Sequence, residues 1–246
     1  MKLDGKVALV TGGSRGLGKQ MVVAFAERGA EVIIASRKIA DCEQLAGEIR
    51  ERTGQKAVPI ACNVSDWGQC DTLLDTAYAE FGRVDILVNN AGMSPLYPSL
   101  DQIEESLWDK VVALNLKGPF RLAARAGTQM AKSGGGSIIN ISSVAAIRPA
   151  PENLPYAAAK AGLNALTEGF AQAFGPTVRV NTIQCGAFST DVSRAWTPLV
   201  TEALAAGTAL GRVAEPAEIV GAALYFASEA SSFCTGSTLW LDGGVR

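Results

Sequence analysis

The stretch KVALVTGGSRGLG, residues 6–18, decides the fold of this 246-residue chain. Residues 6–11 are a continuous apolar run of strand length, which is typical of a parallel strand buried on both faces. The next segment, residues 19–30, repeats apolar side chains at helical spacing. A glycine-rich turn between a strand and a helix presents backbone N–H groups and the positive end of the helix dipole to a phosphate. We therefore predict a dinucleotide-binding strand–turn–helix unit here.

The glycines of this turn are spaced GxxxGxG rather than GxGxxG, and the spacing alone is also compatible with an ordinary turn. Because glycine has no Cβ, the pyrophosphate and the helix can approach the backbone closely. The predicted cofactor contacts of the turn are Gly12, Ser14, Arg15, Gly16, Leu17 and Gly18.

The end of the second predicted strand, residues 31–36, indicates which dinucleotide binds. An acidic residue there would hold the ribose 2′-hydroxyl of NAD, whereas an arginine accommodates the 2′-phosphate of NADP. Here Ser36 is followed by Arg37, and residues 32–38 contain no carboxylate. Arg15 in the glycine turn offers a second cation to the same phosphate. We predict NADP(H), with two solvated surface arginines as the alternative interpretation.

Strand and helix patterns alternate through the rest of the chain. This alternation predicts an α/β fold with a doubly wound parallel sheet, helices on both faces and right-handed crossovers. No linker or repeat divides the sequence, so residues 1–246 are expected to form a single domain. The segment at about 186–214 is longer than an ordinary connector and is a candidate substrate lid. Further strands are expected at residues 56–61, 84–88, 137–142, 178–183 and 238–241, and helices at 40–53, 66–81, 101–132, 155–174 and 216–227.

Small and polar residues follow two of these strands, at the edge where doubly wound folds bind ligands. Asn63 and Val64 follow the third strand and are expected at the adenine edge of the cofactor. Asn90, Ala91 and Gly92 follow the fourth strand. They are interpreted either as a floor beneath the cofactor or as a tight turn with an amide cap, and the spacing favours neither.

Tyr156 and Lys160 lie four residues apart at the start of an alanine-rich predicted helix. Residues i and i+4 share one helix face, so the ammonium group can approach the phenol. A nearby cation favours the phenolate and is expected to lower the tyrosine pKa from about 10 toward the range useful for proton transfer. The YxxxK pattern alone is also compatible with a surface pair. Ser143, at the end of the preceding strand, is expected at the same edge.

Composition excludes several classes of protein. The chain has no histidine, which rules out histidine-dependent triads and His-ligated metal sites. The net charge of −2 provides no basic surface for nucleic acid or an anionic membrane, and no apolar run approaches the roughly 20 residues of a membrane span. The five cysteines show no CxxC pattern and are expected to be buried free thiols, with no structural zinc. These features predict a soluble, cytoplasmic protein.

Jointly, these motifs resemble the short-chain dehydrogenase/reductase family over essentially the whole chain, with a pattern most similar to the 3-oxoacyl-[acyl-carrier-protein] reductases. The resemblance implies a Rossmann-type fold with a seven-stranded sheet, a nicotinamide cofactor and a homotetramer. It also implies cofactor contacts near the sixth strand. The motifs that carry the resemblance are TGGSRGLG, NNAG, Asn115, Ser143, Tyr156-xxx-Lys160 and the closing LDGG, and the further cofactor contacts are Tyr156, Lys160, Gly186, Phe188 and Thr190.

The resemblance further implies a catalytic tetrad. Tyr156 would protonate the substrate oxygen as hydride arrives from the nicotinamide, and would act as the base in the reverse reaction. Lys160 would lower the phenol pKa and bind the nicotinamide ribose, while Ser143 would orient the carbonyl. Asn115 would bend its helix and hold a water that links Lys160 to solvent. Ser143 is chosen over Ser142 because it stands 13 residues before Tyr156, as is common in the family.

Two residues depart from the family pattern. Cys185 stands where the family usually has proline, which affects the stiffness of the turn after the sixth strand. With no histidine in the chain and no adjacent lysine in the sequence, Cys185 is expected to be an inert pocket-wall residue. Asn63 stands where aspartate is common, and its carbonyl oxygen can still accept a hydrogen bond from the adenine amine.

The expected function is reduction of a small-molecule ketone by NADPH, with a 3-oxoacyl thioester as one candidate substrate. Only Lys132 and Arg179 would be available to an acidic carrier protein. The lid residues Val192, Trp196 and Leu199 suit an apolar or neutral substrate better than a phosphorylated one. The alternatives are an alcohol, polyol or sugar dehydrogenase and, from another class, an inactive dinucleotide sensor, which the complete tetrad disfavours.

Overall fold

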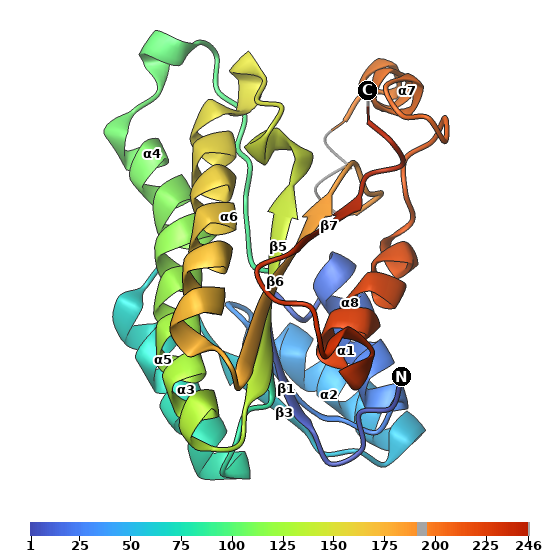
Figure 1. The fold of residues 1–246 in the computed structure, drawn as a ribbon. Helices are drawn as coiled ribbons and strands as arrows, with labels where there is room; N and C mark the ends of the chain where they lie inside the picture. Colours follow the sequence, from blue (N-terminus) through green and yellow to red (C-terminus); the bar gives the residue numbers. More distant parts are fainter. Residues whose placement is uncertain (191–195, 246) are drawn as a thin grey trace.

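A computed structural model describes residues 1–190 and 196–245. Seven strands in these residues form one sheet in the order β3-β2-β1-β4-β5-β6-β7, with every neighbouring pair parallel (Figure 1). The predicted doubly wound α/β fold is therefore confirmed. The strands are β1 (Val7–Thr11), β2 (Glu31–Ser36), β3 (Ala57–Ala61), β4 (Ile86–Asn89), β5 (Gly136–Ser143), β6 (Val178–Cys185) and β7 (Thr238–Leu241).

Helices cover both faces of the sheet (Figure 1). The face that carries α1, α2 and α8 is opposite the face that carries α3, α5 and α6. The α-helices are α1 (Gly16–Glu27), α2 (Ile39–Thr53), α3 (Trp67–Phe81), α4 (Glu105–Val112), α5 (Gly118–Lys132), α6 (Leu154–Phe174), α7 (Pro198–Ala206) and α8 (Ile219–Ala227). Short 3₁₀ turns lie at Leu100–Gln102, Val144–Ala146, Pro151–Asn153, Pro216–Glu218 and Glu229–Ser231.

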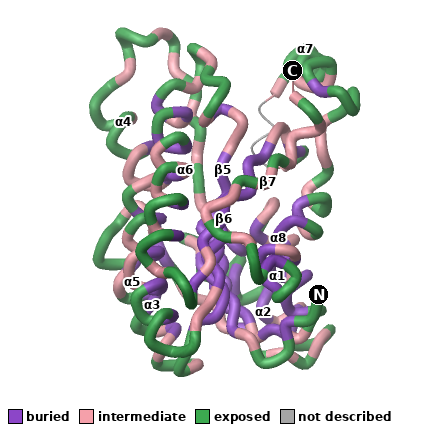
Figure 2. Tube along the Cα trace, viewed as in Figure 1, coloured by how far each residue is buried: buried purple, intermediate pink, exposed green. Residues whose placement is uncertain are grey.

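The central strands are buried on both sides, as their continuous apolar sequences predict. In β1, Ala8 and Val10 pack toward α1 and α2, whereas Val7 and Leu9 pack toward α3 and α5. Figure 2 shows this buried layer running through the middle of the molecule between exposed helix surfaces. The core therefore consists of two apolar layers, one on each face of the sheet.

The strand order reverses between β1 and β4, because the chain builds outward from β1 to β3 and then returns to the other side at β4. In open α/β sheets the crevice at the carboxyl ends of the strands beside such a switch point is where ligands bind. The glycine turn after β1 and the Asn90–Gly92 segment after β4 both lie at this edge. The fold thus brings together the two segments that the sequence predicts for the cofactor.

The predicted lid at 186–214 has more structure than expected from its length alone. It contains α7, whose first turn is capped by the Thr197 side chain accepting a hydrogen bond from the Val200 N–H at 3.3 Å. The sequence Thr197-Pro198 carried this signal, because threonine at the N-cap followed by proline is typical of a helix start. Residues 191–195, including the predicted lid residue Val192, lie outside the described part of the chain.

None of the helices in the described residues is long and apolar enough to cross a membrane. All five cysteines are free thiols, and all except Cys234 are fully buried, as predicted.

Candidate active site

Four predicted residues converge at the carboxyl edge of the sheet. Ser143 is the last residue of β5, and Tyr156 lies in the first turn of α6. Lys160 is one turn further along the same helix. Asn115 lies in a π-helical segment, Ala113–Lys117, that joins α4 to α5. The sequence predicted a bend at this asparagine, and the π-helical segment confirms it.

Lys160 is almost completely buried, with 3% of its surface exposed. Its Nζ donates a hydrogen bond to the Ile141 carbonyl at 2.7 Å and lies 5.6 Å from the centre of the Tyr156 ring. A Cβ placed on Gly92 would lie 3.7 Å from this Nζ and 2.8 Å from Oδ1 of Asn115. The amine therefore faces the segment after β4, on the side where the cofactor cleft is expected.

The Asn115 side chain is fully buried and fixes the loop that follows β4. Its Nδ2 donates to the carbonyls of Met93 and Val111, each at 2.9 Å. Its Oδ1 accepts a hydrogen bond from the Met93 N–H at 3.2 Å. Both polar atoms of the amide are thus engaged with backbone, which explains why a polar side chain is stable in the helix interior. Met93 is a positioned residue that the sequence alone did not reveal.

Ser143, rather than Ser142, lies beside the Tyr156 phenol. The Ser143 side chain interacts with Tyr156 and opposes the rise of the phenol pKa, and the Ser143 Oγ accepts the Ala145 N–H at 3.2 Å. Ser142 is buried with its hydroxyl directed at the Lys160 carbonyl, 3.5 Å away. Successive residues of a strand face opposite sides, which separates the two serines.

The expectation that Lys160 lowers the pKa of the Tyr156 phenol is wrong for the chain by itself. Burial raises the pKa of Tyr156 to about 12, although the interaction with Ser143 opposes the rise. Burial likewise lowers the pKa of Lys160 to about 8. Burial is the largest cause of both pKa shifts, because desolvation disfavours the charged form of each group. The site therefore holds a protonated phenol at neutral pH, which is a proton donor.

Cys185 lies opposite Ser143 in the β5–β6 register and is buried. Burial raises the pKa of its thiol to about 12, against the opposing effect of the Lys160 charge. A thiol with so high a pKa is not a nucleophile at neutral pH. The structure therefore agrees with an inert wall residue.

The glycine turn forms a cradle of bare backbone at the start of α1. Gly12 and Gly16 have φ of 62° and 53°, a region that disfavours side chains. A Cβ on Gly18 would lie 2.1 Å from the Gly12 carbonyl oxygen, so only glycine fits this position. These observations match the close backbone approach that a pyrophosphate at a helix N-terminus requires.

Asn90 holds this cradle against the end of β4. Its Nδ2 donates to the carbonyls of Thr11 at 2.9 Å and Gly12 at 3.2 Å. The Thr11 hydroxyl in turn accepts the N–H groups of Asn90 at 3.0 Å and Ala91 at 3.2 Å. The structure shows the amide cap of this segment, and its place beneath the cofactor stays a prediction. The structure also shows Thr11 as a linking residue that the sequence did not reveal.

The end of β2 adjoins the glycine turn, as the NADP prediction requires. The Ser14 hydroxyl lies 3.1 Å from the Ser36 hydroxyl, which joins the two segments. Arg15 and Arg37 are both exposed at this place. Leu17, the second residue of α1, is partly buried and packs against the core. The structure thus brings the predicted 2′-phosphate residues to one surface, with their side chains reachable from solvent.

The segment after β3 is built by its own hydrogen bonds. The Asn63 N–H donates to Oε1 of Gln69 at 2.8 Å, and Asn63 Oδ1 accepts the Ser65 N–H at 3.3 Å. A carbonyl oxygen has two lone pairs, so Oδ1 can accept a further hydrogen bond from an adenine amine. Val64 is buried, and its carbonyl oxygen would lie 2.1 Å from a Cβ on Gly118. The Val64 side chain therefore belongs to the core.

Of the three cofactor contacts predicted after β6, one lies at the glycine turn and two pack elsewhere. Thr190 reaches the glycine turn, since its Cβ would lie 3.8 Å from a Cβ on Gly16. Gly186 packs against Asp242, with 2.8 Å between a built Cβ and the Asp242 Cα. The ring of Phe188 is buried in the core layer below α1 and α8. The structure brings Thr190 to the cleft but not the Phe188 ring, which leaves only the Phe188 backbone for a cofactor contact.

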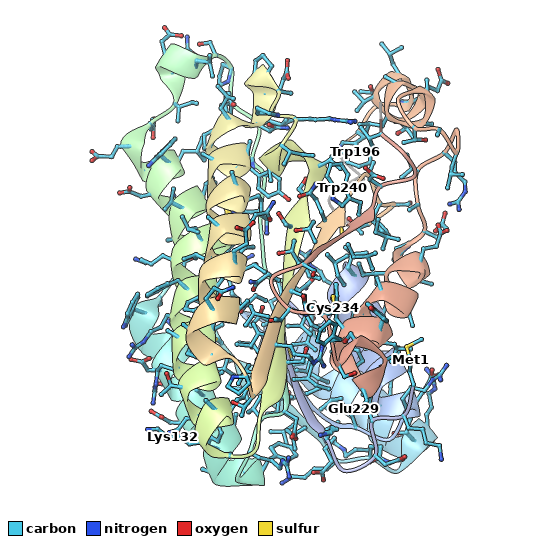
Figure 3. All side chains as sticks on the ribbon, in the orientation of Figure 1. Met1, Lys132, Trp196, Glu229, Cys234 and Trp240 are labelled. Carbon is cyan, nitrogen blue, oxygen red and sulfur yellow. The ribbon has the colours of Figure 1, made fainter. Side chains whose placement is uncertain are left out.

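The predicted lid residues are not all placed over the site. Trp196 is half-buried and lies toward the open end of the sheet in Figure 3, whereas Leu199 on α7 is 75% exposed. The apolar wall beside Tyr156 comes instead from the loop after β4, from α4 and from the start of α6. Its residues are Pro95, Tyr97, Leu107, Val111, Asn153 and Pro155, together with Tyr156.

The chain matches known proteins along its whole length. The family model for short chain dehydrogenases matches residues 6–199. A D-threitol dehydrogenase of Mycolicibacterium smegmatis is 36% identical, covering 99% of this chain and 94% of the relative. The 3-oxoacyl-[acyl-carrier-protein] reductase FabG of Thermotoga maritima is 35% identical, covering 100% and 99%.

Among solved structures, a gluconate 5-dehydrogenase from Burkholderia cenocepacia in complex with NADP and tartrate superposes with a TM-score of 0.93. It is 35% identical and covers 98% of this chain and 95% of that one. The sheet order, the glycine cradle and these full-length similarities agree with one another. The chain belongs to the short-chain dehydrogenase/reductase family and is an NAD(P)-dependent oxidoreductase that acts on the CH–OH/C=O couple.

Proposed function

We propose that this enzyme reduces a ketone to a secondary alcohol with NADPH, and that Tyr156 is its general acid. The observation that carries the proposal is the Tyr156 side chain beside Ser143, with its ring centre 5.6 Å from Nζ of the buried Lys160 and with its pKa raised by burial. When bound, NADPH would supply the hydride to the carbonyl carbon. Tyr156 gives the phenolic proton to the carbonyl oxygen, and the Ser143 hydroxyl orients that oxygen by a hydrogen bond.

Lys160 and Asn115 support this step from below. The Nζ of Lys160 lies near the segment after β4, where it can reach a ribose hydroxyl and favour the phenolate left after proton transfer. Asn115 fixes the Met93 backbone and keeps the adjoining loop in place, and we propose that it also holds the water that links Lys160 to solvent.

The preference for NADPH over NADH rests on the end of β2. Arg37 and Arg15 are exposed beside the linked serines Ser14 and Ser36, where a 2′-phosphate is expected. Guanidinium groups bind phosphate by paired hydrogen bonds, and residues 32–38 have no carboxylate to bind a bare ribose.

The positions of Lys132 and Arg179 bear on whether the substrate is attached to an acidic carrier protein. Arg179 is half-buried and donates to the carbonyls of Phe226 and Ser228, so it is committed to the structure. Lys132 lies at the end of the molecule away from the carboxyl ends of the strands (Figure 3). Neither supports docking of an acidic carrier at the site. The aromatic and aliphatic wall beside Tyr156 favours a small, largely apolar ketone.

A polyol or sugar dehydrogenase is the second candidate function. It is favoured by the relatives named for D-threitol and gluconate. It requires Tyr156 to act as a base, and the raised pKa of Tyr156 in the chain by itself opposes that role.

We propose that the enzyme is a cytoplasmic homotetramer. Free cysteines are typical of a reducing compartment. Aromatic side chains on α3, α5 and α6 form a continuous row, with ring centres of Trp67 and Phe120 6.2 Å apart and those of Phe120 and Phe170 5.6 Å apart. Trp67 and Phe120 are exposed, and Trp240 on β7 is 49% exposed on a second face. Two separate apolar faces fit an assembly with two interfaces. Light scattering of the purified chain should give four times the monomer mass, and a monomer would refute the assembly.

The activity is tested by an absorbance screen. The enzyme is mixed with NADPH or NADH and with matched ketones, 3-oxoacyl thioesters and keto sugars, and with NADP⁺ and the corresponding alcohols. The proposal predicts NADPH consumption with one or more ketones and a smaller rate with the carrier-type thioesters. Tight NADPH binding without turnover on the whole panel would instead support the dinucleotide sensor.

A further inference from the structure

The helix that carries the proposed acid has no cap of its own. The first N–H groups of an α-helix lack partners within the helix and are usually satisfied by a side chain at the N-cap. The N-cap of α6 is Asn153, and its side chain makes no hydrogen bond to the first turn. Its Oδ1 accepts the Ala150 N–H at 3.1 Å instead. The first turn of α6, which contains Tyr156, therefore needs a hydrogen-bond acceptor from elsewhere in the chain.

Tyr97 supplies that partner from the loop after β4. Its hydroxyl accepts the Leu154 N–H at 2.9 Å, across 57 residues of sequence. The same hydroxyl donates to the Pro151 carbonyl at 2.5 Å. Leu154 is the first residue of α6, two positions before Tyr156. The Tyr97 hydroxyl is therefore hydrogen-bonded both to the first residue of the helix and to the turn that precedes it.

The other end of this loop is attached to the site as well. Met93 is bonded through both backbone polar groups to the side chain of Asn115. Residues 93–97 thus connect the π-helical segment at Asn115 to the first turn of α6. Tyr97 also lines the apolar wall next to Tyr156, together with Pro155 and Val111. The loop therefore links Asn115 to the helical turn that contains Tyr156, and both residues belong to the proposed tetrad.

We propose that Tyr97 is a positioning residue, whose hydroxyl caps the catalytic helix and fixes the Tyr156 phenol against Ser143. The proposal rests on the proposed reaction for its kinetic consequence, but not for the cap itself. Lys160 lies a turn deeper and is held by burial and by the Ile141 carbonyl. Loss of the cap should therefore loosen the turn with Tyr156 while leaving Lys160 and the glycine cradle in place.

This localisation separates positioning from a role in binding. A looser Tyr156 spends less time in the geometry needed for proton transfer, and small misplacements of reacting groups lower the rate of the chemical step. A residue that only binds substrate raises KM and leaves kcat unchanged. A residue that only stabilises the fold changes neither, provided that the protein remains folded in the assay.

The test compares Tyr97→Phe with Tyr78→Phe. Both substitutions remove one hydroxyl and keep the ring, and the Tyr78 hydroxyl is buried with no hydrogen-bond partner among the described residues. Three quantities are measured: kcat and KM for a ketone found in the screen, the NADPH dissociation constant by cofactor fluorescence, and amide hydrogen exchange in the first turn of α6.

For Tyr97→Phe we expect kcat to fall by up to about fivefold, the full loss of a helix cap of ordinary strength, which is reached when the uncapped turn is mostly disordered. Exchange at the Leu154 amide should quicken by at least as much, while KM and NADPH affinity change less than about twofold. Tyr78→Phe should change none of these. Unchanged exchange at Leu154, or a raised KM with unchanged kcat, would overturn the proposal. Exchange requires no turnover, so it tests the cap even if the screen disproves the reductase.

Discussion

Replacing Lys160 by methionine should remove the free-energy cost of burying the ammonium charge in the folded protein. Methionine keeps the length of the side chain and removes the ammonium group. Burial lowers the pKa of Lys160 from 10.5 to about 8. A difference of this size corresponds to about 3 kcal/mol of lost stability at neutral pH, because the unfolded chain binds the proton more tightly than the native one.

The two pKa values of Lys160, in the folded and unfolded states, determine whether stability rises or falls with pH. Between about pH 8 and 10.5 the unfolded state holds more protons than the native state, so wild-type stability gains from this group as the pH rises. By about pH 9.5 the cost falls to roughly 1 kcal/mol. The stability of Lys160→Met relative to wild type should therefore decrease by about 2 kcal/mol between pH 7 and 9.5. Loss of the hydrogen bond to Ile141 lowers the variant's stability by a constant amount and does not alter this slope.

Urea unfolding of the cofactor-free proteins at a series of pH values measures this difference directly. Lys132→Met is the matched control, because Lys132 is exposed and the substitution changes the net charge equally. The control should follow wild type at every pH. Parallel stability curves for Lys160→Met and wild type would refute the reasoning, since they would mean that the buried amine is charged at the same pH in both states.

Two further substitutions test the cofactor site. Arg37→Ala should lower the affinity for NADPH about tenfold in a fluorescence titration and change the affinity for NADH less than about twofold. Only NADPH loses a charged hydrogen bond in this variant. Equal loss of affinity for both cofactors would contradict the NADP assignment. Gly18→Ala places a Cβ 2.1 Å from the Gly12 carbonyl and should cost about 2 kcal/mol of stability and abolish cofactor binding. Gly47→Ala in α2, where nothing lies within 4 Å of the new Cβ, should instead stabilise by about 0.5 kcal/mol in thermal unfolding, and similar losses in both variants would argue against the cradle.

Much of the fold follows from local sequence. Continuous apolar runs such as residues 31–36 indicate buried parallel strands, and alternation with helices fixes the class of sheet. Short-range signals also placed the glycine turn, the bend at Asn115 and Ser143 at a strand end. These features depend on a few neighbouring residues, so they can be read without knowing the tertiary structure.

What the sequence could not reveal depends on long-range packing. The pKa of Tyr156 moves upward because the surrounding protein excludes water, and a four-residue spacing to Lys160 carries no information about burial. The Phe188 ring packs into the apolar layer that also contains buried residues of α1 and α8, which are distant in the sequence. Tyr97 caps a helix 57 residues away, which no local pattern indicates.

The central claim is that the Tyr156 phenol delivers the proton to the substrate oxygen. Tyr156→Phe keeps the ring and removes that proton, so the most direct measurement is its kcat at saturating NADPH and ketone beside its NADPH dissociation constant. We expect kcat to fall by at least about a hundredfold, the contribution typical of general acid catalysis, with cofactor affinity within about twofold of wild type. Retention of wild-type turnover by this variant would contradict the account.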